Sequence, residues 1–274
     1  MITSNEVVEK NRKDWDAYSE KWAAFNHSEK ILRPVFDNPS RAFHSKTWEL
    51  IRKYVPDLKG KRICVPSSGD NLAVFAFALS GASVTSCDIS ENQLACAKQI
   101  AAREGLDSAI EFICADTMKL DGIPDDQYDL VYTSNGVHVW LDDLPSMYAN
   151  IHRILKKGGL NILYEIHPYL RPFDENLQIV KPYDATGPFE DEMTVNFHWR
   201  LQDIMNAMMH SGLHLEHFEE MFDEKDYERP FWLKTEDILN GVRASREEVD
   251  KMYDWRENPR MALPNWICLV GRKV

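Results

Sequence analysis

The chain has 274 residues, a net charge of −12 and a hydrophobic content of 44%. This length fits one large α/β domain with insertions. The negative charge argues against nucleic acid as a partner, because affinity for a polyanion comes largely from Lys and Arg. No apolar run is long enough to cross a bilayer, so no membrane partner is expected.

Cysteine usage and the first residues indicate the compartment. The five cysteines show no close pairing, which fits a reducing environment better than a disulfide framework. The opening stretch MITSNEVVEKNRKDW lacks the apolar core of a signal peptide. We therefore expect a cytoplasmic protein.

An aromatic helix is predicted near the start of the chain. Residues 6–25 place large aromatic side chains on one helical face: Trp15, Tyr18, Trp22 and Phe25. This stripe is either ordinary packing or a lid whose rings cover a cationic ligand. Residues 34–45 contain two prolines and little periodicity, which predicts a connector before a helix over 46–54.

Residues 61–88 have the pattern of a complete strand, loop, helix and strand. The loop Ser67-Ser68-Gly69 is made of small residues, so a ligand could lie close to its backbone. The second strand stops at Asp88, about twenty positions after this loop, where a carboxylate can accept both hydroxyls of a ribose. With Gly69 as its one glycine, the loop suits a pyrophosphate poorly. It predicts a nucleoside ligand with a cationic or zwitterionic tail.

Polar residues also follow the next strands. Asp116 comes directly after the predicted strand 110–114, and a polar stretch over 134–140 follows the strand 128–133. The carboxyl ends of parallel strands meet at one sheet edge, where such sheets bind ligands. His138 follows the fourth strand and is a candidate general base, as is His167 after the fifth; a purely structural role stays open for both.

Regular alternation of strands and helices ends after His167. Residues 1–60 are expected to form a helical cap or lid and 61–274 the core, with cap insertions at about 168–199 and 219–264. A helix over 201–211, a strand over 213–218 and a last strand over 266–270 complete the prediction. No HExxH pattern or close cysteine pair occurs, so no metal site is expected.

Three motifs occur in a characteristic order: DLVYTSNGVHVW at 129–140, RILKKGG at 153–159 and PNWICLVGRK at 264–273. Together with residues 61–88, they resemble class I S-adenosylmethionine-dependent methyltransferases that act on small molecules. The resemblance implies an α/β fold, with a doubly wound, mostly parallel seven-stranded Rossmann-like sheet and an antiparallel C-terminal hairpin. It also implies S-adenosylmethionine as cofactor and a small-molecule acceptor.

The resemblance further implies roles for individual residues. Asp88 would accept the ribose hydroxyls, Ile89 would pack on the adenine and Asp116 would receive the adenine amino group. The other implied cofactor contacts are Tyr18, Ser67, Gly69, Ala115, Thr117, Ser134 and Asn135. The loop after the first strand departs from the usual family motif, which begins with an acid and carries more glycines.

The predicted function is the transfer of a methyl group to a small molecule by in-line displacement. One alternative is an NAD(P)-dependent oxidoreductase, which the single-glycine loop and the terminal hairpin disfavour. A second alternative is a protein that binds S-adenosylmethionine without catalysis. Neither the acceptor nor the oligomeric state is predicted.

Overall fold

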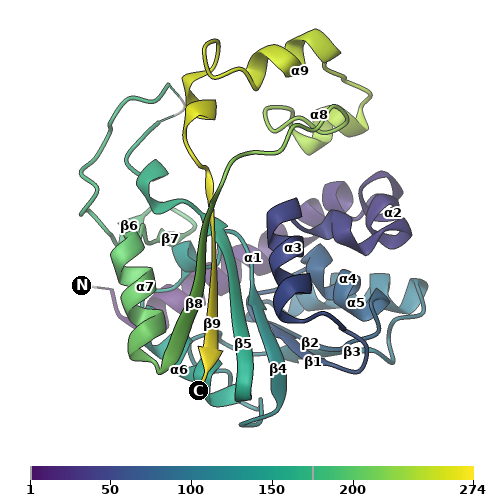
Figure 1. Ribbon diagram of the computed structural model, residues 1–274, viewed down its shortest axis with the longest axis vertical. Helices are drawn as coiled ribbons and strands as arrows, with labels where there is room; N and C mark the ends of the chain where they lie inside the picture. Colours follow the sequence, from purple (N-terminus) through teal and green to yellow (C-terminus); the bar gives the residue numbers. More distant parts are fainter. Residues whose placement is uncertain (1, 175) are drawn as a thin grey trace.

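A computed structural model describes residues 2–174 and 176–274, apart from the side chain of Phe25. Its centre is a seven-stranded sheet in the order β3-β2-β1-β4-β5-β9-β8 (Figure 1). The strands are β1 Arg62–Val65, β2 Ser83–Asp88, β3 Ile110–Cys114, β4 Tyr128–Thr133, β5 Leu155–Ile166, β8 Leu213–Met221 and β9 Trp266–Lys273. Strands β1 to β5 pair in parallel, whereas β9 runs antiparallel to both β5 and β8. The predicted fold class is confirmed.

Helices cover both faces of the sheet and bury one hydrophobic cluster on each. The helices are α2 Glu29–Asp37, α3 Ser45–Tyr54, α4 Leu72–Leu79 and α5 Glu91–Arg103 on one face, with α6 Leu144–Ile154 and α7 Leu201–His210 on the other. Helix α4 is apolar along most of its length, and six of its residues are buried. Such a helix has to be covered on several sides. The sheet, α2 and the 3-10 turn η1 Pro39–Ala42 cover it.

The remaining elements gather around the carboxyl ends of the parallel strands. Helix α1, Ser4–Asn26, packs against α5. The first insertion holds η3 Pro168–Leu170, β6 Phe189–Glu190 and β7 Val195–Asn196. The second insertion holds α8 Thr235–Leu239, α9 Arg246–Met252 and η4 Pro259–Ala262, and its helices lie beyond the sheet edge in Figure 1.

The predicted connector over 34–45 is wrong in its first part. Helix α2 runs through Pro34 as far as Asp37, and Leu32 and Val35 on it are buried. An internal proline costs one backbone hydrogen bond, but the apolar side chains of α2 are buried against the core. The last two strands are longer than predicted: β8 runs to Met221 instead of 218, and β9 runs to Lys273 instead of 270.

No helix in the described ranges is both long enough and apolar enough to span a membrane. Within the same ranges, no cluster of three or more His, Cys, Asp or Glu side chains could hold a metal ion.

Candidate functional site

A cavity of about 650 Å³ lies at the carboxyl ends of the parallel strands. This volume is in the range of sites for small molecules and cofactors. The loops after β1, β2, β3 and β4 form much of its wall, and α1 and both insertions add the rest. The sequence-predicted residues on the wall are Ser67, Gly69, Asp88, Ile89, Asp116, Thr117, Ser134 and Asn135.

The loop after β1 is fixed in a tight conformation. Ser67 has φ 47° and Gly69 has φ 48°, in the left-handed region that a glycine adopts without strain. Ser67 Oγ lies 2.6 Å from Thr117 Oγ1, and Ser68 N donates to the carbonyl of Cys87 at 2.8 Å. These contacts connect the loop to β2 and to the segment after β3.

Asp88 connects the same loop to α5. Its Oδ2 accepts from Gly69 N at 2.8 Å and its Oδ1 from Ser90 N at 2.8 Å. Burial raises the pKa of Asp88 to about 6, although both backbone hydrogen bonds act in the opposite direction. Each carboxylate oxygen can accept a second hydrogen bond. The side chain therefore has acceptor capacity left for two hydroxyls of a ligand that reaches it.

Asp116 offers a second acceptor on the neighbouring strand end. Its Oδ1 accepts from Met118 N at 2.9 Å. Its Oδ2 is buried without a hydrogen-bond partner among the described residues, although Lys119 Nζ lies 3.3 Å away. Because β3 pairs directly with β2, both carboxylates belong to one part of the cavity wall. An amino group of a bound nucleoside would satisfy Asp116 Oδ2.

Gln93 is a site residue that the sequence analysis missed. Its side chain is 2% exposed, and both of its amide atoms are buried without partners in the described parts of the chain. It lines the cavity beside Gly69, where an added Cβ would lie 3.6 Å from Gln93 Oε1. In the sequence, Ser90 and Gln93 have the spacing of a helix-capping pair. Only the serine half forms, with Gln93 N donating to Ser90 Oγ at 3.1 Å.

Asparagine and serine side chains connect the loops at the far side of the cavity. Asn71 caps α4, since its Oδ1 accepts from Ala73 N at 2.9 Å, and its Nδ2 donates to Ser134 Oγ after β4. Ser134, Asn135 and Gly136 then continue the wall toward β5.

Helix α1 contributes an aromatic wall. Trp15 and Trp22 line the cavity, and the Trp15 ring meets Trp140 edge-on with a centroid distance of 5.3 Å. Trp22 Nε1 donates to Asp70 Oδ1 at 2.9 Å, and His27 Nε2 pairs with Asp70 Oδ2. These two contacts hold the end of α1 on the loop after β1.

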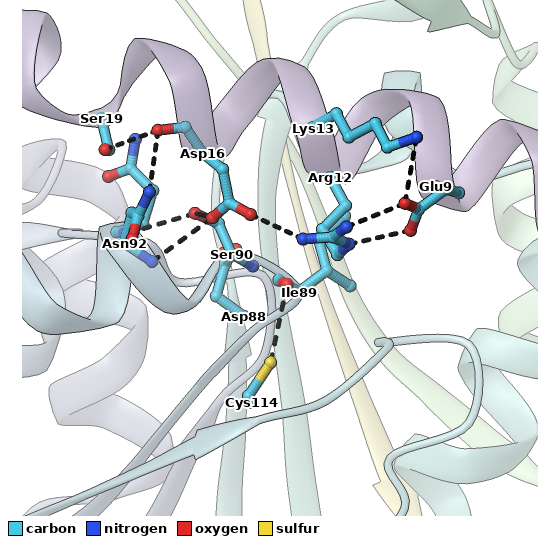
Figure 2. A network of polar contacts seen from close by, with 11 residues as sticks. Glu9, Arg12, Lys13, Asp16, Ser19, Asp88, Ile89, Ser90, Asn92 and Cys114 are labelled. Carbon is cyan, nitrogen blue, oxygen red and sulfur yellow. Dashed lines mark hydrogen bonds and ion pairs between the residues drawn. The ribbon is translucent and has the colours of Figure 1, made fainter.

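A second contact holds the middle of α1 on the start of α5 (Figure 2). Asp16 Oδ1 accepts from Ser90 Oγ at 2.6 Å and from Asn92 N at 3.3 Å, and Asp16 Oδ2 accepts from Arg12 at 2.7 Å. A carboxylate at a helix N-terminus is favoured by the exposed N–H groups and by the helix dipole. Ser90 follows Asp88 closely, so α1 is held near the predicted ribose acceptor.

Three predicted site residues are not brought to the cavity wall. Tyr18 is 39% exposed and packs beside Trp22, but it does not line the cavity. Ala115 is buried and does not line the cavity either. His138 is 3% exposed, and burial lowers its pKa to about 3. Its Nε2 lies 3.1 Å from Tyr148 Oη, while its neighbours Val137 and Val139 line the cavity. The weaker candidate His167 is also buried, with Nε2 3.0 Å from Glu220 Oε1.

Comparisons with known proteins agree with this geometry. A family described as "Methyltransferase domain" matches residues 66–163. A sterol 24-C-methyltransferase of Gibberella zeae is 37% identical over 86 residues, which is 31% of this chain and 22% of that protein. The chain spans less than half the length of the sterol methyltransferases that it matches.

Solved structures show the same fold. An S-adenosylmethionine-dependent methyltransferase from Mesorhizobium loti superposes with a TM-score of 0.57 at 24% identity, covering 82% of this chain and 96% of that one. A geranyl diphosphate C-methyltransferase from Streptomyces coelicolor superposes with a TM-score of 0.55 at 13% identity, covering 84% and 77%. Residues 66–163 therefore match a methyltransferase domain, and the chain shares its fold with solved S-adenosylmethionine-dependent methyltransferases, whose cofactor is S-adenosylmethionine.

Proposed function

We propose that the protein transfers a methyl group from S-adenosylmethionine to a small-molecule acceptor. The observation that carries this proposal is the pair of carboxylates at neighbouring strand ends. Asp88 retains capacity to accept two hydroxyls, and Asp116 holds a buried oxygen without a hydrogen-bond partner in the described chain. An adenosine offers two ribose hydroxyls and one adenine amino group, which match these acceptors.

The other wall residues complete the proposed cofactor site. Ile89 packs on the adenine. Thr117, which contacts Ser67, lines the cavity beside the adenine. Gly69 lies on the cavity wall and donates to Asp88, which places its backbone beside the proposed ribose position. Ser134 and Asn135 contact the methionine end. The amide of Gln93 is buried beside Gly69, where it can donate to or accept from the ribose.

The bound cofactor supplies a methyl carbon already activated by its sulfonium, and the electron pair of the broken bond stays on sulfur. The protein then has to align the acceptor and exclude water. The rings of Trp15, Trp22 and Trp140 suit the sulfonium of the cofactor, because an aromatic face attracts positive charge. His138 does not line the cavity, so it would influence an acceptor only through another residue.

Several features favour a small acceptor over a macromolecule. Helix α1 forms part of the cavity wall, and Arg171 and Arg229 reach it from the insertions, which supports a lid role for α1 and caps at about 168–199 and 219–264. Helices α2 and α3, within the proposed lid 1–60, pack on the sheet instead. The similar proteins include enzymes whose names specify a sterol and geranyl diphosphate. The cytoplasmic location and the lack of a nucleic-acid partner stay predictions from the sequence.

Calorimetric titration with S-adenosylhomocysteine, the product form of the cofactor, tests the proposal. We expect micromolar or tighter binding to the wild type, and no comparable binding of NAD or NADP. Tight dinucleotide binding with no response to S-adenosylhomocysteine would favour the oxidoreductase instead. Cofactor binding without any methyl transfer across a broad acceptor panel would favour a non-catalytic protein.

A further inference from the structure

We propose that the acceptor carries an anionic group, a carboxylate or a phosphate, and that Arg171 binds it. The proposal rests on the methyltransferase function above and specifies its substrate class. It follows from the place of Arg171 on the cavity wall, from the contacts of Glu165 near it and from the distribution of charge along the cavity wall.

Arg171 lines the cavity just beyond the end of β5. It follows the short turn η3 and shares the wall with Ile166, the last residue of β5. Burial lowers the pKa of its guanidinium, and the charge of Glu165 partly opposes this effect. Within residues 2–174 and 176–274, no carboxylate forms an ion pair with Arg171 and no acceptor forms a hydrogen bond with its side chain. Partly burying a cation without a partner is costly, which favours a ligand anion there.

Glu165 is close enough to influence Arg171 but is bound to the backbone instead. Its Oε1 accepts from Gly136 N and from Ile166 N, both at 2.8 Å, and its Oε2 accepts from His138 N at 3.4 Å. The side chain is 2% exposed, and burial raises the pKa of its carboxyl. Glu165 therefore orients the loop after β4, and it forms no ion pair with Arg171 in the described parts of the chain.

The surroundings of Arg171 are basic. Burial lowers the pKa of Lys181, and the positive charge of Arg171 lowers it further. Burial together with the charges of Arg171 and Lys181 lowers the pKa of His198 to about 4. His198 is therefore neutral at ordinary pH, whereas Arg171 and Lys181 carry positive charge, which in a chain with a net charge of −12 produces a local positive potential. This potential attracts an anion and repels a cationic acceptor.

Charge is also distributed unevenly along the cavity. The acids Asp88 and Asp116 lie at the ends of β2 and β3, whereas Arg171 lies past β5, on the other side of β1 and β4 in the sheet. Arg229 reaches the same cavity from the segment between β8 and α8, at its exposed rim. A nucleoside at the acidic end leaves the basic end for the second substrate.

One competing role for Arg171 is a contact with the carboxylate of the cofactor itself. The two roles predict different binding data, because 5′-methylthioadenosine keeps the nucleoside but lacks the amino-acid portion. If Arg171 binds the acceptor, Arg171→Met leaves the affinities for S-adenosylhomocysteine and for 5′-methylthioadenosine within about threefold of the wild type. If Arg171 binds the cofactor carboxylate, only the affinity for S-adenosylhomocysteine falls.

The direct test screens matched compound pairs against protein saturated with S-adenosylhomocysteine. One arm compares carboxylates with their primary amides, and the other compares phosphate monoesters with their parent alcohols. Thermal shift detects binding, and calorimetry gives affinities for the compounds that bind. We expect anionic members to bind and their neutral partners not to, and the stronger arm identifies the anion.

Variants complete the experiment. Arg171→Met should weaken the binding of the anionic compounds at least tenfold, and Arg229→Met should weaken it less. Arg171→Lys should keep the preference for anions at reduced affinity, which separates charge recognition from misfolding. Arg52→Met is the matched control, since Arg52 is exposed on α3, away from the cavity.

Three results would overturn the inference while leaving the methyltransferase function intact. The first is a screen in which no anionic compound outperforms its neutral partner. The second is an Arg171→Met protein that behaves like Arg52→Met. The third is a selective loss of S-adenosylhomocysteine affinity in Arg171→Met. Failure of the wild type to bind S-adenosylhomocysteine at all would instead contradict the proposed function.

Discussion

The two ends of the cavity are built from different kinds of structure. The acidic end consists of short loops that leave β1, β2 and β3, so the parallel sheet itself sets the spacing of Asp88 and Asp116. The other end takes Arg171 and Arg229 from the two insertions, distant parts of the chain, while α1, which contributes Trp15, contacts the loops after β2 and β4. Regular secondary structure thus fixes the proposed cofactor end, and long-range packing fixes the proposed acceptor end.

The largest effect on cofactor affinity is expected from a substitution at the acidic end. Asp88→Ala removes the proposed acceptor of both ribose hydroxyls and leaves Gly69 N and Ser90 N without their partner. Hydrogen bonds to a charged group contribute about 1.5 to 3 kcal/mol each, so the affinity for S-adenosylhomocysteine should fall by at least about 100-fold. Calorimetry measures the change.

Asp107→Ala is the control for this variant, because Asp107 is exposed in the turn between α5 and β3. Unchanged cofactor affinity in Asp88→Ala would remove Asp88 from the site.

Proton binding by Asp88 gives the next largest effect. Burial raises its pKa to about 6, so the carboxyl binds a proton below that pH and loses one of its acceptors. The affinity for S-adenosylhomocysteine should therefore fall by up to about tenfold per pH unit below about pH 6. Titrations between pH 5 and pH 8 test this expectation.

The same raised pKa has a consequence for the cofactor-free chain. The native state favours protonated Asp88 more than the unfolded state does, so the contribution to stability is present at low pH and is lost as pH rises through about 6.

In Asp88→Asn, the pH dependence of S-adenosylhomocysteine binding should disappear. If it persists, a group other than Asp88 controls it.

The contrast between the two ends also explains what sequence reasoning could reach. Asp88, Asp116 and Ser134 were found because each follows a strand whose apolar pattern is plain, and the strand order then brings them together. Gln93 was missed because a polar residue in the first turn of a helix normally caps that turn. Only the folded chain shows that its amide is buried toward the cavity.

The acceptor end was harder to predict for a physical reason. Arg171 and Arg229 lie in insertions without a repeating pattern, so nothing in their local sequence indicates which surface they face. His138 was selected because it follows β4, but the turn η2, His138–Trp140, directs Val137 and Val139 to the cavity instead. Position after a strand predicts nearness to the site, whereas side-chain direction depends on the turn.

A smaller effect is expected where the two ends are connected. Asp16→Ala removes the acceptor that holds α1 on Ser90 and Asn92 (Figure 2). Loss of such contacts costs about 1 to 3 kcal/mol locally. We expect faster amide hydrogen exchange in α1 and a three- to tenfold weaker affinity for S-adenosylhomocysteine, about 0.6 to 1.4 kcal/mol.

Asp14→Ala on the same helix is the control, since its carboxylate makes no hydrogen bond or ion pair in the described structure. Identical exchange rates in the two variants would show that Asp16 does not hold the helix in place.

The smallest effect is expected at His138. Its pKa of about 3 keeps the imidazole neutral at ordinary pH, and the side chain lies behind the cavity wall. Once an acceptor is known, His138→Asn should change kcat by less than about threefold and leave the pH profile of kcat unchanged. Loss of a limb from that profile would restore His138 as a general base.

The central claim is that Asp88 and Asp116 bind one adenosine between them. A crystal structure of the protein with S-adenosylhomocysteine tests it most directly. We predict that both ribose hydroxyls lie within hydrogen-bond distance of the Asp88 carboxylate and that the adenine amino group donates to Asp116 Oδ2. A nucleoside bound elsewhere, or a cavity without ligand at millimolar S-adenosylhomocysteine, would contradict the account.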